Sequence, residues 1–569
     1  MNFRRVGTGE YMNRLVSRIF IGAISVVTIA SAPVVRAEAE TIPAAYQYDV
    51  DVLQQTYPGT RDQGKYNTCW AFSVVGLAEF DLIHDNKIAN KSIDLSELQL
   101  AYYTYHNEED PFGGTYADML KTFRYLDSGG NLNFCTRALL QWQGLVSEAD
   151  LPYEKAATTQ VLDSSYAFSK DVAHLQNVYI LDIHEQPQAV KKEIMEHGAA
   201  GISYYSGQSL GRYDTTAYYD RTRDSVATFY CPTESTADHA VNIVGWDDDF
   251  PATNFKTQPE GNGAWLVRNS WSDQTGNDYK SYFWISYYDK GIEDDAWILD
   301  FEPADNYDFN YQYDGCALVA KTWNTPVCAN VFQAQGAENE QLRAVSLAIN
   351  EATNVPYTIK IYTNLADRSN PRSGILAATV KGTTTYEGNY TIPLKKAVSL
   401  QKGTNYAVVV ELGKSGVGID IERSTIRPFF QTNAYIDYDQ SFIYQNGRWH
   451  DLAEEAEYNF ETGNLCIKAF TDKSGANIGK VAKVKNAGST KNSAKLSWTK
   501  VSGAKGYELY RATSKNGTYK KVATTSKTSH QDKKLSSKKT YYYKVRAYKT
   551  SGGNMIEGKL TGAVKTRTK

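Results

Sequence analysis

Apolar residues recur at helical spacing in the first part of the chain. A helix with one buried face is predicted by apolar positions at i, i+3, i+4, i+7 and i+11, namely Ala71, Val74, Val75, Ala78 and Leu82. The segment Ser96-Glu97-Leu98-Gln99 has the pattern of a capping box and predicts the start of a second helix. Residues 133–143 predict a third helix that ends before Gly144.

After Gly198 the pattern changes to short runs of β-branched and aromatic residues. These runs predict strands at residues 201–205, 240–246, 264–268 and 282–288. Helices followed by strands favour an α+β fold for residues 45–300.

The rest of the chain is predicted to be almost entirely strands. Residues 301–471 contain strand patterns separated by Gly, Asn and Asp turns, for example at 355–362, 388–392 and 405–412. Residues 480–569 contain shorter strands at a spacing typical of a β-sandwich, and the Lys/Ser/Gly stretch 472–479 is the predicted linker. A length of 569 residues agrees with several domains, here 45–300, 301–471 and 480–569.

The N-terminus resembles a targeting segment. Four arginines precede the apolar run 19–30, which is too short to span a bilayer comfortably, and Val35-Arg36-Ala37 has the small residues of a signal-peptidase site. Residues 1–37 are therefore predicted to be a signal peptide, with an uncleaved anchor as the alternative. The mature protein is expected to be secreted or associated with the cell surface.

The net charge of -3 conceals two parts of opposite sign. Residues 472–569 contain 24 Lys and Arg against 4 Asp and Glu, whereas the remainder contains 37 basic and 60 acidic residues. The acidic body argues against a nucleic-acid-binding protein. The basic C-terminal segment instead suggests contact with an anionic polymer of the cell envelope.

Six cysteines without C-x-x-C spacing argue against both a disulfide scaffold and structural zinc. The histidines show no pair at metal-ligand spacing, and we expect neither a metal nor a cofactor. Cys69, however, stands at the first turn of a predicted helix, where the helix dipole would lower its pKa and favour the thiolate. Alone, such a cysteine is more often a core residue.

Two further residues change this interpretation. A thiol nucleophile needs a base, and the base needs a group that orients it. His239 begins one predicted strand and Asn269 ends the next, so both could face the same site. The order Cys, His, Asn favours a catalytic site.

These motifs resemble the papain-like cysteine peptidases, in particular exported bacterial members. The resemblance spans about residues 49–289 and rests on the segments 63–64, 69–73, 95–99, 128–131, 151–153, 238–241 and 269–271. It implies a helical half and a β half around a cleft. It also implies that Cys69 is the nucleophile, His239 the general acid/base, Asn269 the residue orienting His239, and Gln63 the oxyanion donor.

The same resemblance gives three more residues a role beside the substrate or the base. Gly129 and Gly130 resemble the substrate-binding strand of the family, and Trp271 would shield the bond between Asn269 and His239. Tyr66 and Ser128 stand where family members usually have paired cysteines, so that disulfide is not expected here.

Residues 301–471 resemble the lectin-like domain of such bacterial proteins, which implies either carbohydrate binding or a structural role. Residues 480–569 resemble a fibronectin type III domain, with a core Trp498 and a tyrosine-corner strand at 541–543. The hypothesis is an exported cysteine endopeptidase that cleaves polypeptides. The alternatives are an adhesion protein with an inactive peptidase-like domain, and a cell-wall amidase or transpeptidase using the same three residues.

Overall fold

The computed structural model describes residues 41–569 except 85–86, 88–92, 116–123, 208–218, 221–226, 272–280, 316–318, 322–325, 350–351, 427–430, 457–461, 474–479, 502–503, 516, 552–553 and 559. Residues 1–41 form one unit of the chain and residues 42–569 a second, compact unit. The predicted signal peptide, residues 1–37, lies outside the described residues. None of the described helices is both long and apolar enough to cross a membrane.

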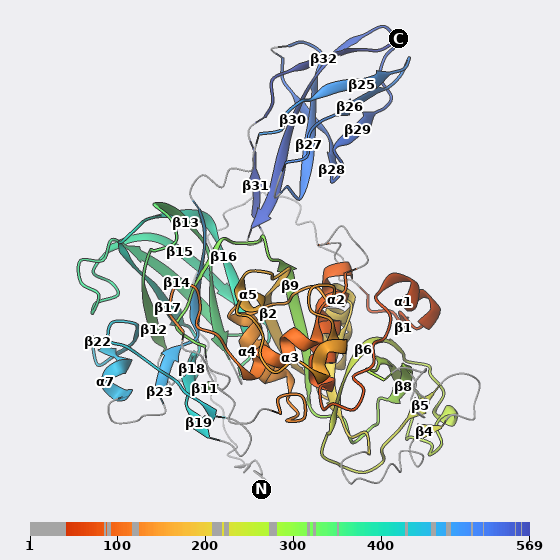
Figure 1. The fold of residues 1–569 in the computed structure, drawn as a ribbon, viewed down its shortest axis with the longest axis vertical. Coiled ribbons are helices and arrows are strands. Elements are labelled where there is room, and N and C mark those ends of the chain that lie inside the picture. Colours follow the sequence, from red (N-terminus) through yellow and green to blue (C-terminus); the bar gives the residue numbers. More distant parts are fainter. Residues whose placement is uncertain are drawn as a thin grey trace, which may run out of the picture. The chain divides into compact units, whose positions relative to one another are not determined.

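The segment up to Pro303 combines helices with a sheet, as predicted (Figure 1). Its helices are α1 Val50–Thr56, α2 Cys69–His84, α3 Glu97–Tyr105, α4 Leu132–Leu140, α5 Ser165–Phe168 and α6 Pro187–His197, with 3-10 turns at Tyr153–Ala157 and Ala252–Asn254. Its strands are β1 Ala45–Tyr46, β2 Ala173–Asp182, β3 Ala200–Tyr204, β4 Tyr219–Asp220, β5 Thr228–Phe229, β6 His239–Asp247, β7 Ala264–Arg268, β8 Tyr282–Ser286 and β9 Asp295–Pro303. The α+β prediction is confirmed.

Helix α2 forms the centre of this segment. It packs against β6 and β9, and almost all of its side chains are buried. The apolar stripe therefore predicted the helix correctly but underestimated how much of it is enclosed. Helix α3 begins as predicted, because the Ser96 hydroxyl accepts the Gln99 N–H at 3.2 Å.

Helix α4 ends earlier than predicted. Its last residue is Leu140 rather than a residue next to Gly144. Trp142 takes a left-handed backbone with φ 70°, and the Gln143 N–H turns back to the Ala138 carbonyl at 3.2 Å. The helix ends there because the Trp142 ring leaves the helical path and stacks on His174.

The sequence pattern did not reveal strand β2, which joins the peptidase-like sheet to the next segment. β2 pairs with β9 on one side and with β16 (Glu387–Gln401) on the other, so a single sheet runs through both segments. A side chain at Gly388 would collide with the Val178 carbonyl of β2, and Gly388 has φ 135°. Only glycine permits this close pairing.

We propose boundaries for the next segment that differ slightly from the predicted ones. Strand β9 continues through residue 300 to Pro303, and we propose to place the first boundary after it. At the other end, Asp472 and Lys473 complete β24, so the stretch 472–479 is not entirely linker.

The lectin-like segment is a sandwich of two sheets with a large apolar core and a smaller apolar cluster around Phe442. One face consists of β10 Phe309–Tyr311, β24 Ile467–Lys473, β13 Asn339–Ile349 and β16, within the joined sheet. The other consists of β15 Ile375–Thr383, β14 Pro356–Thr363, β17 Asn405–Leu412, β12 Val327–Gln333, β21 Ser441–Gln445 and β22 Arg448–Asp451. Smaller elements are β11 Val319–Lys321, β18 Asp420–Arg423, β19 Thr425–Ile426, β20 Gln431–Thr432, α7 Leu452–Ala456 and β23 Thr462–Leu465.

The C-terminal segment is the predicted β-sandwich. One sheet contains β25 Lys485–Ser489, β26 Ala494–Ser497 and β29 Ser529–Asp532, and the other β28 Lys520–Thr525, β27 Gly506–Ala512, β30 Thr540–Ser551, β31 Asn554–Glu557 and β32 Val564–Arg567. Both sheets contribute to one core around Trp498. The Ser536 N–H donates to the Tyr541 hydroxyl at 3.0 Å, which is the contact expected of a tyrosine corner.

Candidate active site

Cys69 is the first residue of α2 and is half-buried. The helix begins here because the Thr68 carbonyl accepts the N–H groups of Ala71 and Phe72. The backbone N–H of Ala240 reaches the Cys69 thiol from the start of β6. Since Ala240 follows His239, the fold brings the predicted nucleophile to the residue next to the predicted base.

His239 and Asn269 lie on antiparallel neighbours, His239 at the start of β6 and Asn269 directly after β7. His239 Nε2 is 2.8 Å from Asn269 Oδ1, and the same oxygen accepts the Ser270 N–H at 2.8 Å. Because an amide oxygen only accepts, Nε2 must carry the proton. In the neutral ring Nδ1 is then the free base.

The Trp271 indole covers His239. The two rings are stacked 4.1 Å apart with an interplanar angle of 10°. His239 and Trp271 are 5% and 6% exposed, so the bond between His239 and Asn269 is shielded from water.

Gln63 is held in a fixed orientation by three hydrogen bonds. Its backbone N–H donates to the Ser270 carbonyl at 3.0 Å, and its Oε1 accepts the Ser270 hydroxyl at 2.7 Å. Its Nε2 donates one proton to the Tyr66 carbonyl at 2.8 Å. The side-chain amide has a second N–H.

Sequence analysis did not identify Tyr153 and Ser270 as parts of the site. The Tyr153 hydroxyl lies 2.7 Å from Thr68 Oγ1 and donates to the Gln63 carbonyl at 3.1 Å. It therefore links Gln63 to the residue before Cys69. Ser270 was recognisable only as the middle residue of Asn-Ser-Trp, and its contact with Gln63 has no local sequence signal.

The glycine pair lies against the nucleophile helix. A Cβ on Gly130 would be 2.5 Å from the Trp70 ring, so only glycine fits beside the residue that follows Cys69. Gly129 has φ 71°, and its carbonyl accepts the Tyr105 hydroxyl. Gly130 therefore lies against Trp70, the residue that follows Cys69, and its role in binding substrate stays a prediction.

The electrostatics of the site differ from the prediction. Burial raises the pKa of the Cys69 thiol, and this outweighs the helix N-terminal N–H groups and the Ala240 N–H, which lower it. Burial likewise lowers the pKa of His239 from 6.5 to about 4, although the bond to Asn269 and the charge of Asp238 oppose the shift. The predicted low thiol pKa is therefore wrong for the unliganded site, where burial favours the neutral forms of both Cys69 and His239.

This state predicts an unusually acidic limb in the pH profile. His239 can accept the thiol proton only while it is neutral, and it becomes protonated as the pH falls through about 4. We expect kcat/KM for an uncharged peptide to be half-maximal near pH 4. In Asp238→Asn the limb should move to lower pH, since Asp238 raises the pKa of His239. If the acidic limb of kcat/KM lay near pH 6.5 in both the parent protein and Asp238→Asn, the assignment of His239 as the base would be contradicted.

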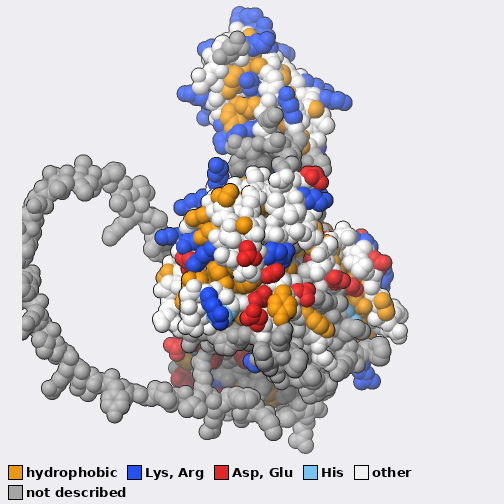
Figure 2. All heavy atoms as spheres, turned by 90° about the vertical axis from the view of Figure 1, so that its left-hand side faces the viewer, with side chains coloured by type: hydrophobic (Ala, Val, Ile, Leu, Met, Phe, Trp, Pro, Cys, Tyr) orange, Lys and Arg blue, Asp and Glu red, His pale blue; other side chains and the backbone are white. Residues whose placement is uncertain are grey.

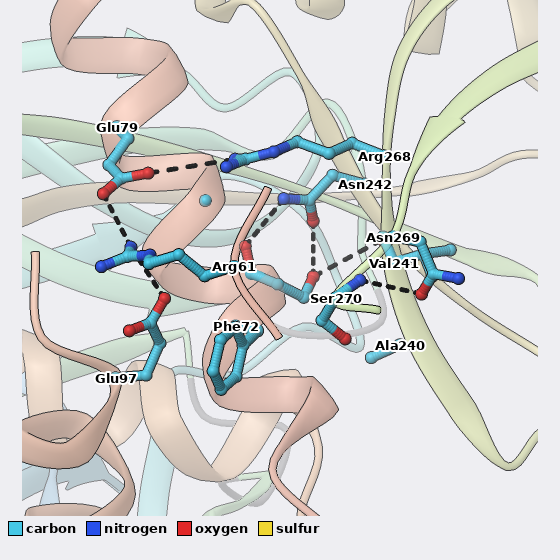
Figure 3. A pocket seen from close by; sticks show the side chains of 12 residues that line it. Arg61, Phe72, Glu79, Glu97, Ala240, Val241, Asn242, Arg268, Asn269 and Ser270 are labelled. Carbon is cyan, nitrogen blue, oxygen red and sulfur yellow. Dashed lines mark hydrogen bonds and ion pairs between the residues drawn. The ribbon is translucent and has the colours of Figure 1, made fainter. Parts of the chain in front are cut away.

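A buried ionic cluster lines the same pocket as Asn269 and Ser270 (Figure 3). Arg61 lies between two carboxylates, with Nη2 2.9 Å from Glu79 Oε1 of α2 and 2.7 Å from Glu97 Oε1 of α3. Arg268, the residue before Asn269, donates to the Pro58 and Gly59 carbonyls and lies 3.9 Å from Glu79. The cluster ties the nucleophile helix to the strand that leads to Asn269.

A second contact joins α2 directly to the strand of His239. The Ser73 hydroxyl donates to Asn242 Oδ1 at 2.6 Å, and Asn242 Nδ2 donates to the Ser73 carbonyl at 3.0 Å. Gly76 makes room for this amide, because a Cβ there would lie 2.5 Å from Asn242 Nδ2.

Two groups of described residues have the composition of metal ligands, Asp81 with His197 and Asp300, and Glu193 with Glu196 and His197. In the first group the Lys87 ammonium already lies between the carboxylates, 2.9 Å from Asp81 and 2.6 Å from Asp300. In the second group Lys192 lies 3.2 Å from each glutamate. In each group one lysine ammonium therefore already pairs with both carboxylates.

Family models match two parts of the chain. Residues 46–298 match the papain family cysteine protease model, and residues 310–471 match the lectin like domain model. The chain contains a papain-family cysteine protease domain. Cys69, His239 and Asn269 fall within the first match.

Curated relatives are similar to part of this chain. Procathepsin L of Mus musculus is 26% identical over 217 residues, which are 38% of this chain and 53% of the relative. Cathepsin L of Sarcophaga peregrina is 27% identical over 220 residues, 38% of this chain and 52% of the relative. The chain thus spans about half the length of the curated relatives it matches.

A solved structure is similar over both matched domains. The cysteine protease and lectin-like domains of Cwp84, a surface layer associated protein of Clostridium difficile, are 25% identical with a TM-score of 0.59. The similarity covers 76% of this chain and 89% of that one. The pairing of a papain-like domain with a lectin-like domain is therefore shared.

Proposed function

We propose that this protein is an exported cysteine endopeptidase that uses Cys69, His239 and Asn269 to cleave polypeptides. The observation that carries the proposal is the bond from His239 Nε2 to Asn269 Oδ1, which leaves Nδ1 as base beside the Cys69 helix. The surface-layer association of Cwp84 supports a location at the cell surface.

The reaction follows from the neutral state of the site. Cys69 Sγ attacks the scissile carbonyl while its proton passes to His239 Nδ1. The second N–H of Gln63 and the Cys69 backbone N–H stabilise the oxyanion. His239 then gives the proton to the leaving amine, and water hydrolyses the thioester. Burial disfavours a permanent ion pair, so charge develops only as the reaction proceeds.

Gln63 provides the test of this proposal. Gln63→Ala should lower kcat by about 100-fold with little change in KM, because an oxyanion donor acts on charge that develops in the transition state. Ser270→Ala removes only the hydrogen bond that Ser270 gives to the Gln63 side chain. It should lower kcat by less than Gln63→Ala does, again with little change in KM. A rise in KM at unchanged kcat would make Gln63 a substrate-binding residue. Product analysis with an added amine separates hydrolysis from transpeptidation.

We propose that the C-terminal sandwich attaches the enzyme to an anionic polymer of the cell envelope. Residues 480–569 contain 23 Lys and Arg against 3 Asp and Glu, a balance of +20. Two of those acids are already paired, Glu508 with Lys521 and Arg546, and Asp532 with Arg511. In the face that Figure 2 shows, basic side chains lie at the top and along the edges of this sandwich, among apolar and uncharged ones.

Deletion of residues 480–569 should therefore preserve hydrolysis of a small peptide and abolish salt-sensitive attachment to a polyanion. The deletion must begin after β24, because Asp472 binds Arg343 within the lectin-like segment. A milder variant replaces the exposed lysines of the turn before β30 (Lys533, Lys534, Lys538 and Lys539) by uncharged residues. Equal attachment of the deleted and full-length proteins at low salt would contradict this role.

A further inference from the structure

Helix α4 joins the glycine pair Gly129-Gly130 to the lectin-like segment. At its N-terminus, directly after the pair, the Asn131 side chain accepts the Phe134 N–H at 3.0 Å and caps the helix. At its C-terminus, Leu140 and Gln141 are 7% and 2% exposed. The carbonyls at a helix end have no partner within the helix, so buried ones need donors from elsewhere.

Those donors belong to the lectin-like segment. Gln312 Nε2 donates to the Gln141 carbonyl at 3.1 Å, and Asn310 Nδ2 donates to the Leu140 carbonyl at 3.5 Å. In the opposite direction, Gln141 Nε2 donates to the Gly315 carbonyl at 2.7 Å. The lectin-like segment therefore completes the end of a helix that belongs to the papain-like domain.

The orientation of the Gln312 amide is fixed by a lysine. Lys468 Nζ lies 2.8 Å from Gln312 Oε1 and 2.7 Å from Asp314 Oδ2. An ammonium group only donates, so the atom of Gln312 that faces it must be the oxygen. Nε2 is then the atom that faces the Gln141 carbonyl. Because Gln312 is only 3% exposed, water does not readily replace this donor.

The backbone of Gln312 also contacts the chain that precedes the glycine pair. A Cβ on Gly114 would lie 2.1 Å from the Gln312 carbonyl, so the two backbones touch directly. A Cβ on Gly315 would lie 2.8 Å from Thr115 Cβ. The stretch of chain that carries the glycine pair is therefore held against the lectin-like segment both before and after the pair.

We propose that Gln312 is a positioning residue for the peptidase reaction, because it holds α4 and thereby the glycine pair at the other end of this helix. The nine residues of α4 form a rigid link of about 13 Å between the two ends. The inference rests on the proposed function and on the predicted role of Gly129 and Gly130 in binding substrate. Since Gln312 contacts neither Cys69 nor His239 through these bonds, its loss should act on KM rather than on kcat.

The same segment offers a matched control. Asn330 is a buried amide whose Nδ2 donates to the Leu465 and Ile467 carbonyls at 3.1 and 3.0 Å, all within the lectin-like segment. Gln312→Met and Asn330→Leu both remove a donor from buried carbonyls and roughly keep the size of the side chain. A merely structural role of Gln312 predicts the same kinetic change in both variants.

The first test is steady-state kinetics of the full-length variants with an extended peptide. Gln312→Met should raise KM roughly fivefold, the effect of one lost hydrogen bond, with kcat within about twofold of the parent value. Asn330→Leu should keep the KM of the parent. Alkylation of Cys69 by iodoacetamide, which needs no substrate strand, should be equally fast in all three proteins. Slower alkylation in Gln312→Met would place the effect on the nucleophile and overturn the inference.

Hydrogen exchange followed by mass spectrometry gives a second readout, which needs no peptidase activity. In Gln312→Met the amides of residues 128–135 should exchange at least about threefold faster than in the parent protein, whereas Asn330→Leu should leave them unchanged. Exchange of these amides at the parent rate, or an equal change of KM in both variants, would overturn the inference.

Failure of the proposed function would look different. A parent protein that hydrolyses no peptide would refute the peptidase proposal, and the exchange of residues 128–135 would still decide whether Gln312 holds the glycine pair. If Gln312→Met does not fold, Gln141→Met replaces it, because this variant removes the bond to the Gly315 carbonyl from the other side of the same junction. The same shifts in KM and in exchange are then expected.

Discussion

Replacing Cys69 by alanine is expected to lower kcat/KM for peptide hydrolysis by roughly 10⁴-fold or more, to background. The sulfur is the atom that bonds to the substrate carbonyl, and no other side chain at the site can replace it. The fold should survive, because the side chain is small and half-buried at the start of α2. Thermal melting of the variant, compared with that of the parent protein, checks this.

Cys135 provides the control. It is fully buried in α4, its thiol donates to backbone carbonyls of its own helix, and burial raises its pKa. Cys135→Ala should keep peptide hydrolysis within a few-fold of the parent while lowering stability modestly. If Cys69→Ala kept more than trace activity in a clean preparation, the peptidase proposal would fail.

Replacing Arg61 by methionine is expected to destabilise the papain-like domain by about 3–5 kcal/mol, the usual cost of leaving buried charges without their partner. Arg61 neutralises Glu79 and Glu97, whose side chains are 0% and 2% exposed. Burial already raises the pKa of both carboxyls, and Arg61 opposes that shift. Without Arg61 they must either remain charged in an apolar interior or take up protons.

The sign of the pH dependence follows from this shift. Carboxyls whose pKa is raised on folding favour the native state below their unfolded pKa and lose that advantage as the pH rises through the folded value. The loss of stability in Arg61→Met, measured against the parent protein by thermal melting, should therefore be larger at pH 8 than at pH 5. Arg372→Met is the matched control, since its pair with Glu411 is about 30% exposed and should contribute less than about 1 kcal/mol. Equal losses in both variants would contradict the role of the cluster.

The parts of the fold that could be predicted are those with local patterns. The stripe from Ala71 to Leu82 predicted α2, and Ser96 predicted the start of α3. The end of α4 was misplaced because Trp142 follows a tertiary contact, the stack on His174. The pairing of β2 with β16 joins residues about 210 positions apart and depends on Gly388, which no local pattern reveals.

The candidate site shows the same division. The motifs around Cys69, His239 and Asn269 were recognisable by spacing, and the fold places His239, Asn269 and Trp271 in contact. The residues that hold Gln63 in place were not recognisable. Ser270 and Tyr153 form hydrogen bonds with Gln63 that exist only in the folded chain. The direction of the Cys69 pKa was also missed, because the helix N-terminus is local while burial is a property of the whole fold.

The most direct test of the central claim is covalent trapping of the nucleophile. The full-length protein would be treated with a peptidyl epoxide, and the adduct would be located by peptide-mapping mass spectrometry while hydrolysis is followed. We predict one adduct, on Cys69, that forms in step with the loss of activity, is absent in Cys69→Ala and is unchanged in Cys135→Ala. Loss of activity with Cys69 unmodified, or an adduct on another cysteine alone, would contradict the account.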